Sequence, residues 1–275
     1  MSHTVRPPFP FALLRFWFLR ILPVWFGIAL LIFLMQIAVS GIVHDNANVR
    51  AFLAFLDMLP SIVKTALGGD MLQAGNTAAL LTIGYQHPFV MFLCMFFAVG
   101  VPTGLLTGEV QKGTMELILS RPVTKTQVYL CACILTLTGM FALVLTMFLG
   151  TAVAVRIYRF DQPIPLDLFF RIAINGGLLA STFGAFALLC AATFARLYSA
   201  LGAAVAFLTL NYFVALVSEW WPSIRFLHRA TLFYFIYYSD LMREWPVRNM
   251  AILTAILLTT AVIGALIWRR RDLPL

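Results

Sequence analysis

The residues best able to take part in chemistry lie within one short stretch of this chain. They are Glu109, Lys112, Glu116, Arg121 and Lys125, in a protein in which only 11% of residues are charged. Long apolar runs flank the stretch on both sides, and the hydrocarbon layer of a membrane excludes ions. We therefore expect residues 108–123 to lie in water at a membrane face, where a partner protein can reach them.

Two glycines in this stretch superficially resemble a phosphate-binding loop, because Gly108 precedes Gly113 by five positions and Thr114 follows. Such a loop needs a lysine directly after the second glycine to reach the phosphates, and then Ser or Thr. Here the lysine, Lys112, comes before the glycine, and no apolar strand leads into the loop. We therefore expect that this chain does not bind ATP and that energy for its work arrives through a partner.

The same stretch predicts a short amphipathic helix. Lys112 and Glu116 are four positions apart and can pair on one side. Pro122 ends the helix, since proline lacks an amide hydrogen and clashes with the preceding turn. The apolar residues on the other side are Met115, Ile118 and Leu119. An isolated helix of this kind is suited to pressing its apolar side against another protein.

Composition predicts an all-α integral membrane protein. Hydrophobic residues make up 62% of the 275 residues, against about half in soluble domains. The net charge of +8 does not indicate nucleic-acid binding, because basic residues mark the ends of apolar runs instead of clustering on a polar domain. Six runs approach or exceed the ~20 residues needed to cross a bilayer. They are residues 21–43, 88–107, 128–155, 168–195, 200–218 and 247–268.

An even number of spans places both termini on one face of the membrane. Arg20 and the arginines at 269–271 lie beside span ends, and such residues favour the cytoplasmic face. We therefore expect both termini and residues 108–123 in the cytoplasm. The two segments left outside, 44–87 and 219–246, are too apolar for free loops and are expected on the outer leaflet or over a translocation path.

Before the first span, residues 7–20 mix aromatic residues with arginines, a composition typical of a helix lying in the membrane interface. The alternative is a simple continuation of the first span. Pro23 leaves that alternative open, because proline can kink a membrane helix without breaking it.

Polar side chains inside the spans are few and costly in lipid, namely Gln36, Asn175 and Asn211. They line a substrate path or hold helices together, and the second interpretation is slightly favoured. The histidines and cysteines have no metal-binding spacing; Cys131 and Cys133, for example, fall on nearly opposite faces of a helix. We expect no catalytic residue, no metal site and no cofactor in this chain.

The run Glu109, Gly113-Thr114, Glu116, Leu117, Leu119-Ser120 and Pro122-Val123 resembles the cytoplasmic coupling segment of type-2 ABC exporter permeases. In that family an acidic residue precedes Gly-Thr-Leu-Glu, a Leu-rich turn, and Pro-Val with a polar or basic residue after it. Met115 stands here in place of the Leu, and Lys125 follows the Pro-Val pair by two positions. The apolar spans, residues 57–60 and the closing residues 269–273 are also similar, so the resemblance covers nearly the whole chain.

This resemblance implies a single transmembrane permease domain over 1–275, with 7–20 as an elbow helix and 108–123 as a coupling helix. It implies an exporter subunit of the cytoplasmic (inner) membrane that is no enzyme by itself, pairs as a homodimer in the bilayer, and is energised by two separate ATPase subunits that bind the ATP. The substrate does not follow from it. The residues expected to contact the ATPase are Glu109, Lys112, Gly113, Thr114, Met115, Glu116, Ile118, Leu119, Arg121 and Pro122.

The alternative function is an intramembrane enzyme acting on lipid-linked substrates. It would need polar catalytic groups that converge near one membrane interface. Asp161, Asp167 and Arg171 are the only modest candidates, and their positions beside a span explain them better.

Overall fold

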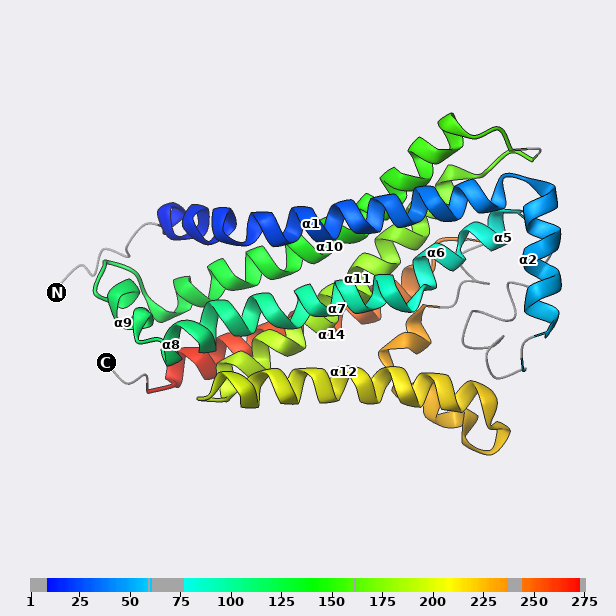
Figure 1. The fold of residues 1–275 in the computed structure, drawn as a ribbon. Coiled ribbons are helices and arrows are strands. Elements are labelled where there is room, and N and C mark those ends of the chain that lie inside the picture. The colour runs from blue at the N-terminus through cyan, green and yellow to red at the C-terminus, as the bar shows by residue number, and fades with distance from the viewer. Residues whose placement is uncertain (1–8, 59, 61–76, 161, 237–243, 273–275) are drawn as a thin grey trace.

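The computed structural model describes residues 9–58, 60, 77–160, 162–236 and 244–272. Within these residues every regular element is a helix, and six helices are long and apolar enough to cross a membrane. This confirms the predicted all-α fold, and six such helices indicate a multi-pass membrane protein. The crossing helices form an elongated bundle (Figure 1). They are α1 (Phe11–Val43), α7 (Pro88–Thr103) with its flanking turns, α10 (Lys125–Ile157), α11 (Leu166–Thr193), α12 (Leu197–Trp220) and α14 (Val247–Arg270).

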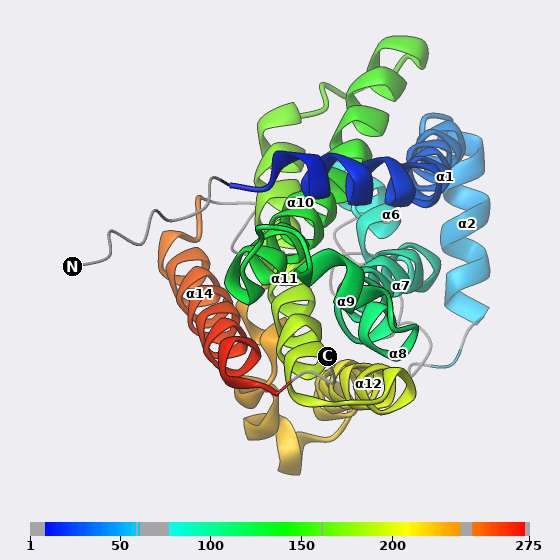
Figure 2. The same ribbon diagram turned by 90° about the vertical axis from the view of Figure 1, so that its left-hand side faces the viewer.

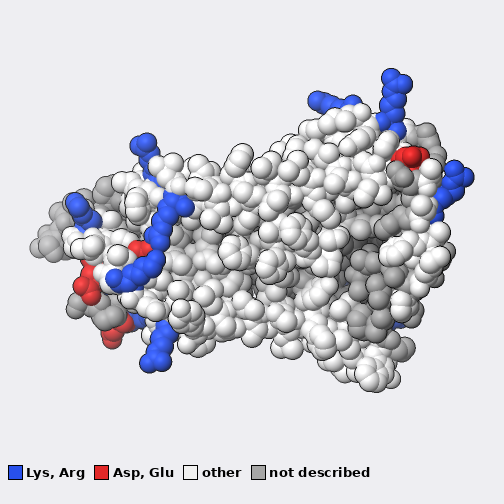
Figure 3. All heavy atoms as spheres, viewed as in Figure 1, with Lys and Arg blue, Asp and Glu red and all other residues white. Residues whose placement is uncertain are grey.

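Charge is distributed along this bundle as a membrane requires. On the face shown in Figure 3, Lys, Arg, Asp and Glu side chains gather at the two ends and leave an uncharged band between them. Large apolar side chains are exposed along the helices of this band, among them Phe26 on α1 and Phe213 on α12. Such side chains are costly in water and cost nothing in lipid, so they mark the surface that the bilayer covers.

Local sequence sets where the helices begin. A capping box starts α10: the Gln127 N–H donates to Thr124 Oγ1 at 3.2 Å, and the Thr124 N–H donates to Gln127 Oε1 at 2.9 Å. Helix α7 begins at Pro88, whose missing amide hydrogen costs nothing in a first turn, and the His87 ring accepts the Phe89 N–H at 3.2 Å. Both devices satisfy backbone donors that a first turn leaves unpaired.

Helix α1 continues through Pro23 without a break, but it changes direction. Figures 1 and 2 show its first turns running across the bundle and its remainder running along it. A proline inside a helix removes one backbone hydrogen bond and bends the axis, which accounts for the change. The segment predicted at 7–20 and the first span are thus one bent helix within the described residues.

The second span is longer than the predicted 88–107. Helices α5 (Thr77–Leu81) and α6 (Ile83–Gln86) lead into α7, and Ala78, Leu80 and Leu81 are buried in the main core. These residues belong to the segment expected to lie outside, 44–87, so part of that segment packs within the bundle. Its other described part, α2 (Asn46–Met58), crosses the far end (Figure 1).

Helix α11 is the most buried of the six and packs against α7, α10, α12 and α14. Small residues permit this close packing, as in many membrane bundles. A Cβ at Gly177 would lie 2.7 Å from the Phe141 ring on α10, closer than real contacts allow. The core of the protein is therefore built around α11.

The predicted external segment 219–246 returns into the bundle. It contains two 3₁₀ helices, η2 (Pro222–Ala230) and η3 (Leu232–Phe235). The Phe233 ring of η3 lies 5.6 Å from that of Phe183, which is well inside α11. Within the described residues, this segment is therefore partly re-entrant and does not lie wholly on an outer surface.

Candidate functional site

Residues 108–123 lie at the end of the bundle where α1 begins and α14 ends (Figures 1 and 2). Helix α7 passes through a π-turn, η1 (Gly104–Gly108), into the single turn α8 (Glu109–Gln111). Gly113 then adopts φ +73°, a left-handed conformation that favours glycine, and α9 (Thr114–Leu119) follows. The prediction of a single helix over this stretch is wrong, because the turn at Gly113 divides the stretch into the two short helices α8 and α9.

This break also separates the charges expected to pair. Lys112 ends α8 and Glu116 belongs to α9, so the two do not share a continuous helix. A four-residue spacing brings side chains together only along one helix. Both residues are exposed, as are Arg121 and Pro122 beyond the end of α9.

The predicted apolar side of this segment exists, and it faces inward. Met115 is only 2% exposed, and Ile118 and Leu119 pack against the same main core. The bundle itself therefore covers the side that we expected to meet a partner. The outward apolar residue is Leu117, which is 70% exposed and was not among the predicted contacts.

Glu109 is held inside the chain. It is 5% exposed, its Oε1 accepts from Arg20 Nη1 on α1, and its Oε2 accepts from the Thr114 hydroxyl at the start of α9. Hydrogen bonds to an ionised carboxylate are the strong kind in proteins. We call these three residues the Glu109 link. It ties the first part of α1 to both short helices of the 108–123 segment.

Sequence reasoning missed Arg20 as part of this site, although it noted the residue for topology. The two charges are 89 positions apart, so no spacing rule connects them. The available signal was the rarity of acidic residues on the expected cytoplasmic face, which is rich in basic ones.

Two further hydrogen bonds connect α8 and the π-turn before it to other helices. Gln111 Oε1 accepts from the Leu197 N–H at 3.0 Å, which satisfies a first-turn donor of α12. The Thr107 hydroxyl donates to the Ala191 carbonyl near the end of α11 at 2.9 Å. A displacement of α8 and the π-turn would therefore act directly on α1, α11 and α12.

The basic end of the chain closes this face. Arg271 Nη1 donates to the carbonyls of Ala191 and Ala192 at 3.1 and 3.2 Å, and Lys125 Nζ donates to the Arg271 carbonyl at 2.9 Å. A cation at these last carbonyls of α11 is favourably placed against the helix dipole. Burial lowers the pKa of Arg271 from its ordinary value.

The mid-span asparagines hold the re-entrant segment in place. Asn211 Oδ1 on α12 accepts the Leu232 N–H at 2.9 Å, and Asn175 Nδ2 on α11 donates to the Phe235 carbonyl at 3.2 Å. Backbone that leaves the helical pattern at membrane depth must find such partners. These contacts favour the interpretation in which both asparagines join structural elements.

Gln36, the third polar residue inside a span, is fully buried between α1 and its neighbours. Its Nε2 lies 3.4 Å from the Leu81 carbonyl of α5. A Cβ at Gly150 on α10 would lie 3.0 Å from the Cβ of Gln36, so α1 and α10 approach closely here. The structure thus places Gln36 at a helix crossing.

The groups that would suit an intramembrane enzyme do not converge in the described part of the chain. Asp167 and Arg171 form an ion pair of 2.9 Å within one helix, and Asp161 lies outside the described residues. Among those residues no three His, Cys, Asp or Glu side chains come together as a metal site.

A comparison with protein-family models gives no match for this chain, and a search of curated proteins finds no relative. Its function must therefore be argued from its own residues and geometry.

Proposed function

We propose that this chain is the permease subunit of an ATP-driven ABC exporter, and that a separate ATPase docks on the 108–123 segment. The lipid-spanning helices supply the transport path, and the ATP is bound and hydrolysed in the partner. Two copies of this chain and two ATPase subunits make the complete exporter, with both termini in the cytoplasm of a cell whose inner membrane holds it.

The position of α9 is the observation that supports this proposal best. It lies at the end of the bundle, packed inward through Met115 and open outward through Glu116 and Leu117. Leu117 and Glu116 are therefore open to a partner on an element that is itself held against the core. We therefore assign ATPase contact to Lys112, Gly113, Glu116, Leu117, Arg121 and Pro122.

The buried members of the predicted contact set have a different role in this proposal. Glu109 and Thr114 keep α9 attached to α1, while Met115, Ile118 and Leu119 seat it on the core. A partner that pushes on α9 then moves a rigid unit and not a loose loop. Small displacements at such a contact are passed on because packed elements shift together.

The test is co-expression with candidate ABC ATPases of the same genome, followed by purification and measurement of ATP hydrolysis. We expect the wild-type chain to recover an ATPase, and Glu116→Lys to lose it because a charge is reversed at the docking surface. Gly113→Val should also lose it, since a β-branched residue opposes φ +73° and reorients α9.

Glu244→Lys is the matched control, because it makes the same charge reversal at an exposed residue far along the chain from this segment. It should retain the ATPase. Equal recovery of an ATPase by all three variants, or none by the wild type with any candidate, would refute the proposal. Reporter fusions at residues 113 and 275 should report the cytoplasm, whereas one at residue 69 should report the outside.

A further inference from the structure

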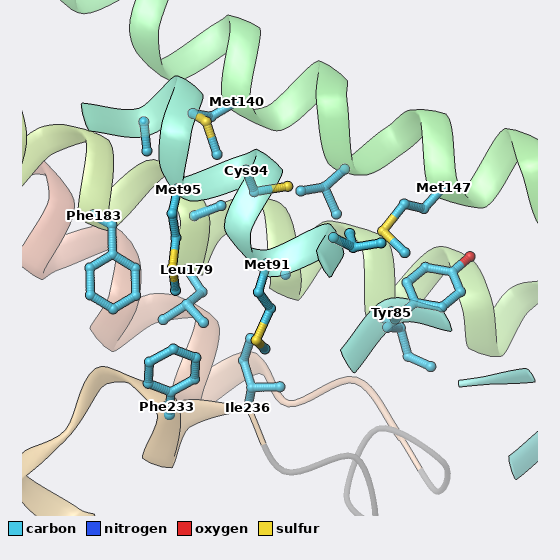
Figure 4. Close-up of a pocket in the computed structure, with 16 residues that line it drawn as sticks. Tyr85, Met91, Cys94, Met95, Met140, Met147, Leu179, Phe183, Phe233 and Ile236 are labelled. Carbon is cyan, nitrogen blue, oxygen red and sulfur yellow. The ribbon is translucent and has the colours of Figure 1, made fainter. Parts of the chain in front are cut away.

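A cavity lies among α7, α10, α11 and η3, away from the 108–123 segment (Figure 4). Its empty space is about 620 Å³, including the part that opens to the surroundings. Gln36, Asn175 and Asn211 do not line it.

The lining is apolar and rich in sulfur. Four methionines and Cys94 surround the space, with Phe183 and Phe233 on one side (Figure 4). Methionine is flexible and polarisable, so it fits irregular apolar shapes and makes favourable contacts with rings. The methionines are Met91, Met95, Met140 and Met147.

This lining excludes polar occupants. Among the described residues no charged side chain lines the cavity, and the hydroxyl of Tyr85 is already paired with Thr151 at 2.8 Å. A buried water needs two to four polar partners, and an unpaired polar group of a ligand costs several kcal/mol in such surroundings (~2–7). A molecule that enters this cavity must therefore be apolar, as a hydrocarbon chain is.

The depth of the cavity indicates where this hydrocarbon comes from. Met140 and Leu179 line it from near the midpoints of α10 and α11, within the apolar band of the bundle. Met91, Met95, Phe233 and Ile236 are partly exposed, whereas Met140 and Met147 on the opposite wall are buried. The partly exposed residues mark a mouth at the depth of the lipid tails.

We propose that this cavity binds the acyl chain of a membrane lipid, inserted between α7 and η3. A chain that leaves the bilayer for this site gains no hydrophobic energy, since lipid tails are equally apolar. Binding instead comes from close packing against methionine and aromatic side chains. The site lies within one subunit and is independent of the exporter proposal.

The proposal can be tested by photocrosslinking of the purified full chain in phosphatidylcholine vesicles. One arm contains a phosphatidylcholine with a diazirine in its acyl chain, and a second contains a diazirine fatty acid. Mass spectrometry then maps the adducts. We expect adducts at Met91 and Met95, in addition to those at lipid-facing Phe213.

Filling the cavity should abolish the adducts at Met91 and Met95 and leave those at Phe213 unchanged. A Cβ at Gly176 would meet only Val144, another lining residue, at an ordinary 3.5 Å, so Gly176→Leu can place its side chain in the space. Ala180→Met is a milder second filler. Gly202→Leu is the matched control, because nothing lies within 4 Å of a Cβ there.

Adducts with the phospholipid probe, lost in both filled variants and kept in Gly202→Leu, would support the proposal. Adducts with the fatty acid alone would show that the site takes a single free chain and overturn its assignment to a bilayer lipid. Labelling of Phe213 without labelling of the cavity would overturn the proposal, as would unchanged labelling in a filled variant that still labels at Phe213.

Discussion

Removing the Arg20 partner of Glu109 should weaken the fold and disconnect α9 from α1. The Glu109 side chain is 6% exposed and Arg20 is 40% exposed, so the acid loses far more solvent than the base. A hydrogen bond to a charged group contributes about 1.5–3 kcal/mol, and the exposure of Arg20 lowers this by solvent screening. We expect Arg20→Gln and Glu109→Gln each to lower the free energy of unfolding by ~1–2 kcal/mol.

The assay is a double-mutant cycle on the free energy of unfolding in micelles. If the two side chains act on each other, the double variant Arg20→Gln/Glu109→Gln loses less than the sum of the singles, by ~1 kcal/mol. Thr114→Val should couple to Glu109→Gln in the same way, since its hydroxyl donates to the other carboxylate oxygen.

Arg15→Gln provides the control. It removes the same charge from an exposed position on the same helix, so it should be additive with Glu109→Gln. A coupling below ~0.3 kcal/mol between Arg20 and Glu109, the level at which distant sites add, would refute this account of the Glu109 link.

Three other outcomes follow from the structure. Asn211→Leu leaves the Leu232 N–H without its partner and should cost ~1–2 kcal/mol, with faster hydrogen exchange confined to η3; unchanged exchange there would contradict the anchoring role. Burial and then Arg225 lower the pKa of His228, so η2 and η3 should be most stable above the ordinary histidine pKa of about 6.5 and should lose stability as pH falls below it. Hydrogen exchange between pH 5 and 8 measures this, and His228→Gln should remove the dependence. Gly177→Ala forces a methyl group against Phe141 and should cost ~1–3 kcal/mol, whereas Gly202→Ala should be neutral or stabilising in the same unfolding assay.

Hydropathy alone predicted the crossing helices, because an apolar run of this length can satisfy its backbone hydrogen bonds in lipid only as a helix. The ends of these helices were predicted less accurately. Residues 77–86 were assigned to the outer segment 44–87, but they continue the second span, and Ala78, Leu80 and Leu81 are buried in the main core. Local rules do not say whether an apolar stretch beside a span lies on the membrane or within the bundle.

For the 108–123 segment, the sequence predicted which apolar residues share a side, but it did not predict the break at Gly113 or the burial of Glu109. The spacing of Met115, Ile118 and Leu119 gave their shared side correctly, since it depends only on helical periodicity. The break at Gly113 was missed because glycine permits a left-handed turn without requiring it. The burial of Glu109 was missed because its partner Arg20 comes from a distant part of the chain.

The re-entrant η3 illustrates the same limit. The sequence marked Asn175 and Asn211 as costly in lipid, but it could not name what they bind. Their partners are backbone groups of Leu232 and Phe235, which every residue carries and no side-chain pattern reveals.

The π-turn at Gly104–Gly108 makes the number of residues in this stretch as important as their identity. An α-helix turns by about 100° per residue, and a π-turn accommodates one residue more than an α-turn. Deleting any one residue of 104–108 would therefore restore the α-helix and leave Glu109 facing Arg20, whereas one further inserted residue would rotate Glu109 by about 100° around the axis, away from Arg20. The π-turn thus preserves the phase between a crossing helix and the 108–123 segment, so an inserted residue would separate Glu109 from Arg20 while every side chain of the Glu109 link is retained.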